Sequence, residues 1–334
     1  MKNVFITGGA GYIGSHTVVE LLNADNDVVI VDNLCNSSID IISRIKKITR
    51  KSFIFENFDL SDRDKVFSIL SKYPIKGIIH FAAHKAVGES INNPEKYYKN
   101  NICSLLNVLA LGEKLNVEHF IFSSSATVYG IPKKSPISED HPVINSSSPY
   151  GTTKIMGEKI ISDIALKSKT NYCLLRYFNP IGAHDSGLIG DNPNGIPNNI
   201  MPYITRVAAG KLKELNVFGN DYPTKDGTCI RDYIHVVDLA KGHVKALGNK
   251  SKEKPSIYNL GTGYGISVLQ LITTFEKVNN IKISYKFTDR RNGDVTSMYA
   301  NASLALQELN WKAELTLEEM LESSWNFQKK ITNG

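Results

Sequence analysis

The chain has 334 residues, of which 42% are hydrophobic and 22% are charged, and its formal net charge is +6. This composition is that of a folded globular protein of about two domains, and it excludes disordered and collagen-like chains. No apolar run approaches the ~20 residues of a transmembrane helix, and the apolar run Val4–Ile6 is too short for a signal peptide, so we expect no membrane partner.

The charges and the cysteines indicate the class of partner and the cellular compartment of the protein. Basic residues are spread along the chain, which argues against a nucleic-acid partner and favours an anionic small molecule. Cys35, Cys103, Cys173 and Cys229 form no Cys-x-x-Cys pair. We therefore expect free thiols, a reducing compartment and a cytoplasmic location.

The first 180 residues alternate between strand and helix patterns. Short apolar strands are expected at Lys2–Thr7, Val28–Val31, Phe53–Phe58, Gly77–Phe81, His119–Ser123 and Tyr172–Tyr177. Helices are expected between them at Tyr12–Asn23, Arg63–Ser71, Pro94–Lys114 and Tyr150–Lys167. This alternation predicts an α/β fold with a doubly wound, Rossmann-type parallel sheet.

The pattern changes after Asn179. Gly, Pro, Asn and Asp are dense in residues 179–200, which predicts a long functional loop. Shorter elements follow, with helices near Asn301–Leu309 and Thr316–Lys329. We expect a first domain of residues 1–179 and a smaller C-terminal α/β substrate-binding region of residues 180–334, and we leave open whether about residues 230–250 return to the first domain.

A glycine-rich segment follows the first expected strand and opens the first helix. Thr7–Gly14 reads Thr-Gly-Gly-Ala-Gly-Tyr-Ile-Gly, which lets backbone N–H groups at a helix N-terminus approach a pyrophosphate. Asp32 ends the second strand, 18 residues beyond Gly14, where it would hold the adenosine ribose hydroxyls. A carboxylate there repels a 2′-phosphate, and no arginine follows Asn33 and Leu34, so NAD is favoured over NADP.

Two local patterns have more than one interpretation. Asp59 is either a partner for the adenine or the N-cap of the helix that begins near Asp62. His80 and His84 are four residues apart, but they fall at a strand end and a turn, so we expect no metal site.

Tyr150 and Lys154 form a Tyr-x-x-x-Lys pair after a strong helix start, Ser146–Pro149. Positions i and i+4 share a helix face, so the lysine cation would lie near the phenol and a nicotinamide ribose. We expect this cation to lower the pKa of Tyr150 from its usual ~10. Ser125 ends the serine run Ser123–Ser125 at the close of the fifth strand, and it either donates to a reacting oxygen or satisfies backbone groups of the loop.

These residues resemble a known family, the extended short-chain dehydrogenase/reductases, and more narrowly its UDP-glucose 4-epimerase branch. The resemblance covers nearly the whole chain. The matching segments are Thr7–His16, Phe81–Ser90, Ser123–Gly130, Arg176–His184, Asn194–Tyr203, Asp226–Asp238 and Arg290–Asp294.

The resemblance implies a reversible C4 epimerisation of UDP-glucose and UDP-galactose through a transient 4-keto sugar, with NAD held throughout. Residues 1–179 would bind NAD and residues 180–334 mainly the UDP-sugar, with Tyr150 as acid/base beside Lys154 and Ser125. NAD would contact Gly8, Gly11, Tyr12, Ile13, Gly14, Asp32, Asn33, Asn36, Ser37, Asp59, Leu60, Phe81, Ala82, Ala83, Lys85, Asn100, Ser125, Tyr150, Lys154 and Phe178. The UDP-hexose would contact Lys85, Ser125, Tyr150, Asn179, Asn199, Ile200, Asn216, Val217, Phe218, Arg231, Arg291, Asp294 and Met298.

Particular positions bear on the reaction. Related NDP-sugar 4,6-dehydratases carry an acidic pair where this chain has Ala126 and Thr127, so epimerisation is favoured, and a dehydratase or another NAD-dependent sugar-nucleotide enzyme is the alternative. A catalytically silent NAD-binding regulator would lack the Tyr150 and Lys154 pair. Met298 stands where the family has either a bulky tyrosine or a small residue, which leaves open whether N-acetylated UDP-hexosamines are accepted.

The resemblance also implies a homodimer. The helices expected at Pro94–Lys114 and Tyr150–Lys167 would pair with their copies in a four-helix interface.

Overall fold

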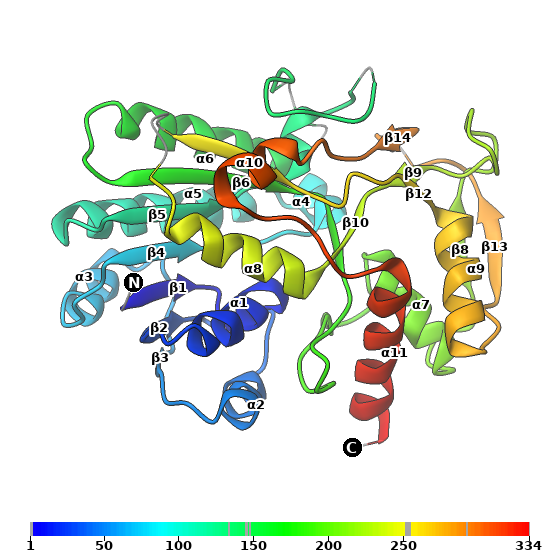
Figure 1. The fold of residues 1–334 in the computed structure, drawn as a ribbon, viewed down its shortest axis with the longest axis horizontal. Coiled ribbons are helices and arrows are strands. Elements are labelled where there is room, and N and C mark those ends of the chain that lie inside the picture. The colour runs from blue at the N-terminus through cyan, green and yellow to red at the C-terminus, as the bar shows by residue number, and fades with distance from the viewer. Residues whose placement is uncertain are drawn as a thin grey trace.

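The computed structural model describes residues 3–132, 134–143, 146, 148–250, 255–291 and 293–333. Figure 1 shows a broad sheet between helical layers, next to a smaller cluster of helices and short strands. Within the described residues the large sheet has seven strands in the order β11-β6-β5-β4-β1-β2-β3, all paired in parallel. They are β1 (Val4–Thr7), β2 (Val28–Val31), β3 (Ile54–Glu56), β4 (Gly77–His80), β5 (His119–Ser123), β6 (Asn171–Tyr177) and β11 (Ser256–Leu260).

Alternation along the strands builds two hydrophobic cores. In β1, Val4 and Ile6 belong to one core and Phe5 to the other, because successive side chains of a strand point to opposite faces. The first core is covered by α1 (Tyr12–Asn23), α2 (Asp40–Thr49), α8 (Val236–Leu247) and α10 (Ser303–Leu309). The second is covered by α3 (Arg63–Leu70), α5 (Pro94–Lys114) and α6 (Pro149–Ala165). The predicted doubly wound, Rossmann-type parallel sheet is confirmed.

The smaller region has a core of its own, at the right of Figure 1. Its helices are α7 (Ile200–Ala208), α9 (Val268–Asn279) and α11 (Leu317–Asn333), and its parallel strand pair is β8 (Leu215–Phe218) with β13 (Tyr285–Thr288). Short strands join it to the large sheet. They are β7 (Asn179–Ile181) paired with β10 (Tyr233–His235), and β9 (Ile230–Arg231) between β12 (Ile266–Ser267) and β14 (Ser297–Met298).

The chain returns to the large sheet after it has left it. β11 extends the sheet edge beside β6, and α8 packs against α1. Both lie beyond residue 179, so the C-terminal half contributes one strand to the large sheet and one helix beside α1. The domain limits 1–179 and 180–334 remain predictions.

Some elements differ from the sequence-based expectations. The helices α2 and α4 (Val87–Asn92) were not predicted, and the loop expected at 179–200 contains β7. The third strand is shorter than the expected Phe53–Phe58, because it pairs only along Val29–Val31 of β2. No helix among the described residues is long and apolar enough to cross a membrane.

Candidate active site

The turn between β1 and α1 depends on glycine at two positions. Gly8 has a φ of +69°, and a Cβ there would lie 2.9 Å from the backbone nitrogen of Ala82. A Cβ on Gly14 would lie 2.2 Å from the carbonyl oxygen of Gly8. The N-cap of α1 is Gly11, which has no side chain to bond the first N–H groups of the helix, so these groups are available to a ligand. This turn fits the pyrophosphate of a dinucleotide.

Asp32 lies at the carboxyl end of β2, beneath the glycine turn. Its Oδ2 accepts the N–H of Ala10 at 3.0 Å, and its Oδ1 accepts the N–H of Leu34 at 2.9 Å and the hydroxyl of Ser37 at 3.1 Å. Burial raises the pKa of Asp32, although these hydrogen bonds oppose the rise. The carboxylate is therefore fixed in place at the point where a ribose would lie.

The structure rules out one of the two interpretations of Asp59. The N-cap of α3 is Asp62, which accepts the N–H of Lys65 at 3.1 Å, so the N-cap interpretation of Asp59 is wrong. Asp59 instead accepts from the side chain of Asn33 at 2.8 Å and from the backbone of Ser61 at 2.8 Å. Burial raises the pKa of Asp59, but these hydrogen bonds outweigh it and lower the value. Asp59 thus lies beside the loop that follows Asp32.

The loop after β4 carries Phe81, Ala82, Ala83 and Lys85 and is tied to neighbouring elements. Thr7 accepts the N–H of Ala82 at 3.1 Å, and Lys85 lies with its Nζ 5.9 Å from the ring centre of Tyr12. The sequence-based prediction named Asn100 but missed its neighbour Asn101, which holds this loop in place. Its amide bonds the backbone of His84 and, at 3.0 Å, the hydroxyl of Thr153.

Tyr150 and Lys154 both lie buried on α6, as the spacing predicted, with exposed fractions of 8% and 4%. Ser148 caps this helix through the N–H of Gly151 at 3.2 Å. Lys154 donates from Nζ to the carbonyl of Ser123 at 2.7 Å and lies 6.0 Å from the centre of the Tyr150 ring. Both side chains therefore meet the carboxyl end of β5.

The electrostatics of this pair correct one prediction. Burial raises the pKa of Tyr150 above 10, the nearby phenol of Tyr177 adds to the rise, and a hydrogen bond with Ser125 opposes it. Burial also lowers the pKa of Lys154 to about 8. The expectation that Lys154 lowers the pKa of Tyr150 is wrong for the protein alone, because the ammonium is directed to the Ser123 carbonyl and burial dominates.

A buried ion pair supports the serine run and was not predicted. Glu158 on α6 accepts from Arg176 at 3.0 and 2.7 Å and from Ser124 at 2.5 Å. Ser123 donates to the phenol of Tyr177 at 3.1 Å. Arg176 lies within an apolar strand, and a charged residue is rarely buried there unless it is paired. This position is the only signal in the sequence that could have indicated a buried ion pair at Arg176.

The residues expected to contact a UDP-hexose gather around β9. Asp294 accepts from Arg291 at 2.9 and 3.2 Å and lies 3.6 Å from Arg231. The guanidinium of Arg291 stacks over the ring of Phe218 at 4.7 Å, and Met298 pairs with Arg231 in the strand register. Two arginines held by one carboxylate form a site that fits a diphosphate.

Other predicted contacts are placed less directly. Asn199 is the N-cap residue of α7, next to Ile200, and donates to Asp191 at 3.3 Å. Among the described residues, no partner bonds the buried side-chain oxygen of Asn216. The side chain of Val217 lies in the core of the smaller region, where it does not face a ligand. Phe178 packs with Ala126 beside Met298.

Among the described residues, no three His, Cys, Asp or Glu side chains are grouped to hold a metal ion. His80 instead bonds the hydroxyl of Thr7 at 2.9 Å, and burial lowers its pKa to about 3.

Comparisons with known proteins agree with this geometry. The profile described as GDP-mannose 4,6 dehydratase matches residues 5–324. The UDP-glucose 4-epimerases of Haemophilus influenzae and Bacillus subtilis are 54% and 52% identical, each over 99% of this chain and 98% of its own length. The chain belongs to the UDP-glucose 4-epimerase family. A solved member of the family, the enzyme of Bifidobacterium longum in complex with NAD+ and UDP, superimposes over the full length of both chains with a TM-score of 0.96 at 49% identity.

Proposed function

We propose that this protein interconverts UDP-glucose and UDP-galactose by inverting the C4 hydroxyl of the hexose, with NAD as a resident cofactor. The observation that supports this most is the buried pair of Tyr150 and Lys154 on α6, with Lys154 bonded to the Ser123 carbonyl at the carboxyl end of β5. The glycine turn and Asp32 follow β1 and β2 of the same parallel sheet, and Arg231 and Arg291 belong to the smaller region. Family membership supports the same reaction.

The chain's own residues would bind NAD at the carboxyl edge of the sheet. The N–H groups of the glycine turn would hold the pyrophosphate, Asp32 the adenosine ribose, and Lys154 the nicotinamide ribose. When bound, NAD supplies a hydride acceptor and a positive charge near the phenol. Because the hydride returns to the sugar, the cofactor stays bound through the cycle.

Tyr150 would exchange the proton of the C4 hydroxyl. Its pKa in the protein alone is raised by burial, so the phenolate needs more positive charge than Lys154 provides from its position at the Ser123 carbonyl. The hydroxyl of Ser125 accepts the N–H of Thr127 at 3.2 Å, as one of its two sequence-based alternatives predicted, and it would in addition donate to the reacting oxygen. Cofactor binding and base activation are therefore coupled.

The UDP part of the substrate would provide most of the binding energy. Arg231 and Arg291 are held by Asp294 and would meet the diphosphate, while the hexose meets few fixed polar groups. A 4-keto sugar tethered through UDP then turns over and receives the hydride on its other face.

Two alternatives differ at named residues. A 4,6-dehydratase needs an acid and a base for water elimination, and Ala126 and Thr127 offer neither. We also propose N-acetylated UDP-hexosamines as further substrates, because Met298, where the family has either a bulky tyrosine or a small residue, is flexible and packs against the cluster of Ala126 and Phe178.

The decisive experiment substitutes Tyr150→Phe. We expect conversion of UDP-galactose to UDP-glucose to fall by a factor of about 10² or more while NAD stays bound, because only the proton-transfer group is lost. Tyr73→Phe, which removes a phenol that donates to Glu56 and is not among the proposed contacts of NAD or UDP-hexose, serves as the control. Near-normal turnover in Tyr150→Phe would rule out this role.

We further propose a homodimer and a cytoplasmic location. α5 and α6 pack side by side, and each exposes an apolar side chain, Leu106 at 44% and Met156 at 39%. The free thiols of Cys35 and Cys103 are exposed, which suits a reducing compartment. The homodimer is tested by sedimentation of the purified protein, which measures its oligomeric state.

A further inference from the structure

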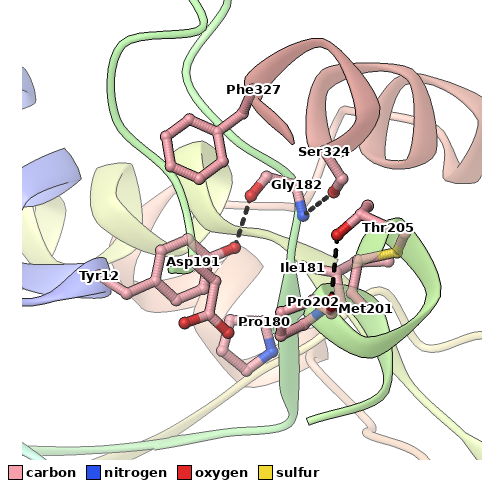
Figure 2. A pocket seen from close by; sticks show the side chains of 10 residues that line it. All are labelled: Tyr12, Pro180, Ile181, Gly182, Asp191, Met201, Pro202, Thr205, Ser324 and Phe327. Atoms are coloured by element: carbon pink, nitrogen blue, oxygen red, sulfur yellow. Dashed lines mark hydrogen bonds between the residues drawn. The ribbon is translucent and has the colours of Figure 1, made fainter. Parts of the chain in front are cut away.

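The side chain of Tyr12 leaves the dinucleotide turn. Its backbone begins α1, but its phenol reaches β7 and donates to the carbonyl of Gly182 at 2.7 Å (Figure 2). Gly182 has a φ of +92°, and a Cβ there would lie 2.8 Å from Nε2 of His235. The phenol therefore contacts the chain at a turn that only glycine fits.

The same turn is held from its other side by α11. The N–H of Gly182 donates to the hydroxyl of Ser324 at 3.0 Å, and the N–H of Ala183 donates to Ser323 at 3.1 Å. Figure 2 shows Tyr12 and Ser324 approaching Gly182 from different elements. The turn is thus fixed between the first helix of the sheet and the last helix of the smaller region.

The segment after this turn leads to the UDP-sugar site. Ala183 pairs with Gly190, and Asp191 follows next to the ring of Tyr12 in the pocket of Figure 2. Asp191 in turn accepts from Asn199, the residue that begins α7. A short path of backbone and side-chain contacts therefore joins Gly182 to Asn199.

We propose that the hydroxyl of Tyr12 is a positioning group that sets the 182–199 segment for UDP-sugar binding, so that the helix end that holds the NAD pyrophosphate also fixes the second site. This inference rests on the proposed function. Burial and the carboxylate of Asp191 raise the pKa of Tyr12 well above its ordinary value, so the phenol remains a hydrogen-bond donor. Lys85, over the ring of Tyr12, links the same side chain to the loop after β4.

The test removes the hydroxyl and keeps the ring. In NAD-loaded Tyr12→Phe protein, we expect UDP to bind about five- to tenfold more weakly by calorimetry, since a partly buried carbonyl loses its donor. We expect the KM for UDP-galactose to rise by a similar factor, and by more than kcat or the content of bound NAD falls. Tyr73→Phe, which loses a phenol donor to Glu56, is the matched control and keeps the parent's UDP affinity.

A second variant separates positioning from damage to the fold. Ser324→Ala releases the N–H of Gly182 from α11 and leaves every residue of the glycine-rich turn unchanged. If both side chains act through Gly182, Ser324→Ala also weakens UDP binding, and the double variant with Tyr12→Phe shows a loss smaller than the product of the two single losses.

The outcomes divide clearly. Unchanged UDP affinity in Tyr12→Phe with NAD retained overturns the inference and leaves the proposed function intact. Loss of NAD with unchanged UDP affinity overturns it as well, because the hydroxyl would then serve the cofactor alone. A parent protein that binds no UDP would defeat both the inference and the proposed function.

Discussion

Burial of the charged Lys154 side chain should lower the free energy of unfolding by a measurable amount. The side chain is 4% exposed, and burial lowers its pKa to about 8, against 10.5 for a free lysine. A fall of about 2.5 pH units corresponds to about 3 kcal/mol at neutral pH, where the folded state must keep a charge away from water. Lys154→Met keeps the length of the chain and removes this charge. After allowance for the lost hydrogen bond to Ser123, of about 1 kcal/mol, we expect the variant to be about 2 kcal/mol more stable and inactive.

The pH dependence isolates the cause. Because the folded pKa lies below the unfolded one, the unfolded protein binds more protons between about pH 8 and pH 10.5, and the stability of the parent rises with pH relative to the variant. The advantage of Lys154→Met is therefore complete below the folded pKa and is lost before pH 10.5, above which only the missing hydrogen bond of about 1 kcal/mol remains and the variant is the less stable protein. Urea unfolding of both proteins, stripped of nucleotide, measures the difference across this range. A difference independent of pH, or a less stable variant at neutral pH, would refute the reasoning.

Two further predictions concern buried groups. Glu158→Leu should lower the free energy of unfolding by about 3–5 kcal/mol, because it leaves the guanidinium of Arg176 buried without its partner, and Glu158→Leu with Arg176→Met should recover much of that loss in the same urea assay. An unrestored double variant would contradict this account. Gly14→Ala should lose bound NAD, measured by absorbance of the nucleotide released on denaturation, because its Cβ would meet the Gly8 carbonyl, whereas Gly88→Ala has open space and should keep it.

Local signals explain what was predictable. The order of strands and helices up to residue 177 follows from short apolar runs and helix starts, and the glycine turn and Asp32 belong to one continuous stretch of chain. The missed α2 had a signal too, because Ile42 and Ile45 are spaced i, i+3 and both are buried. That helix was within reach of the sequence.

Contacts between distant segments were not predictable. Tyr12 and Gly182 are 170 residues apart, and no periodicity or motif joins them. Asp59 and Asp62 are both typical N-cap residues, and only the backbone geometry at Lys65 distinguishes them. The predicted lowering of the pKa of Tyr150 was wrong for the same reason, because burial and the direction of the Lys154 ammonium are properties of the packed protein.

The three consecutive serines at the end of β5 have three different partners: Ser123 bonds Tyr177, Ser124 bonds Glu158, and Ser125 bonds the N–H of Thr127. Gain or loss of one serine in this run would leave its composition nearly unchanged while every hydroxyl met the wrong neighbour. A sequence comparison would score such an indel as a minor event, although it would disturb the ion pair of Glu158 and the hydrogen bond between Lys154 and the Ser123 carbonyl together. Tolerance to insertion should therefore be lowest where the sequence looks most repetitive.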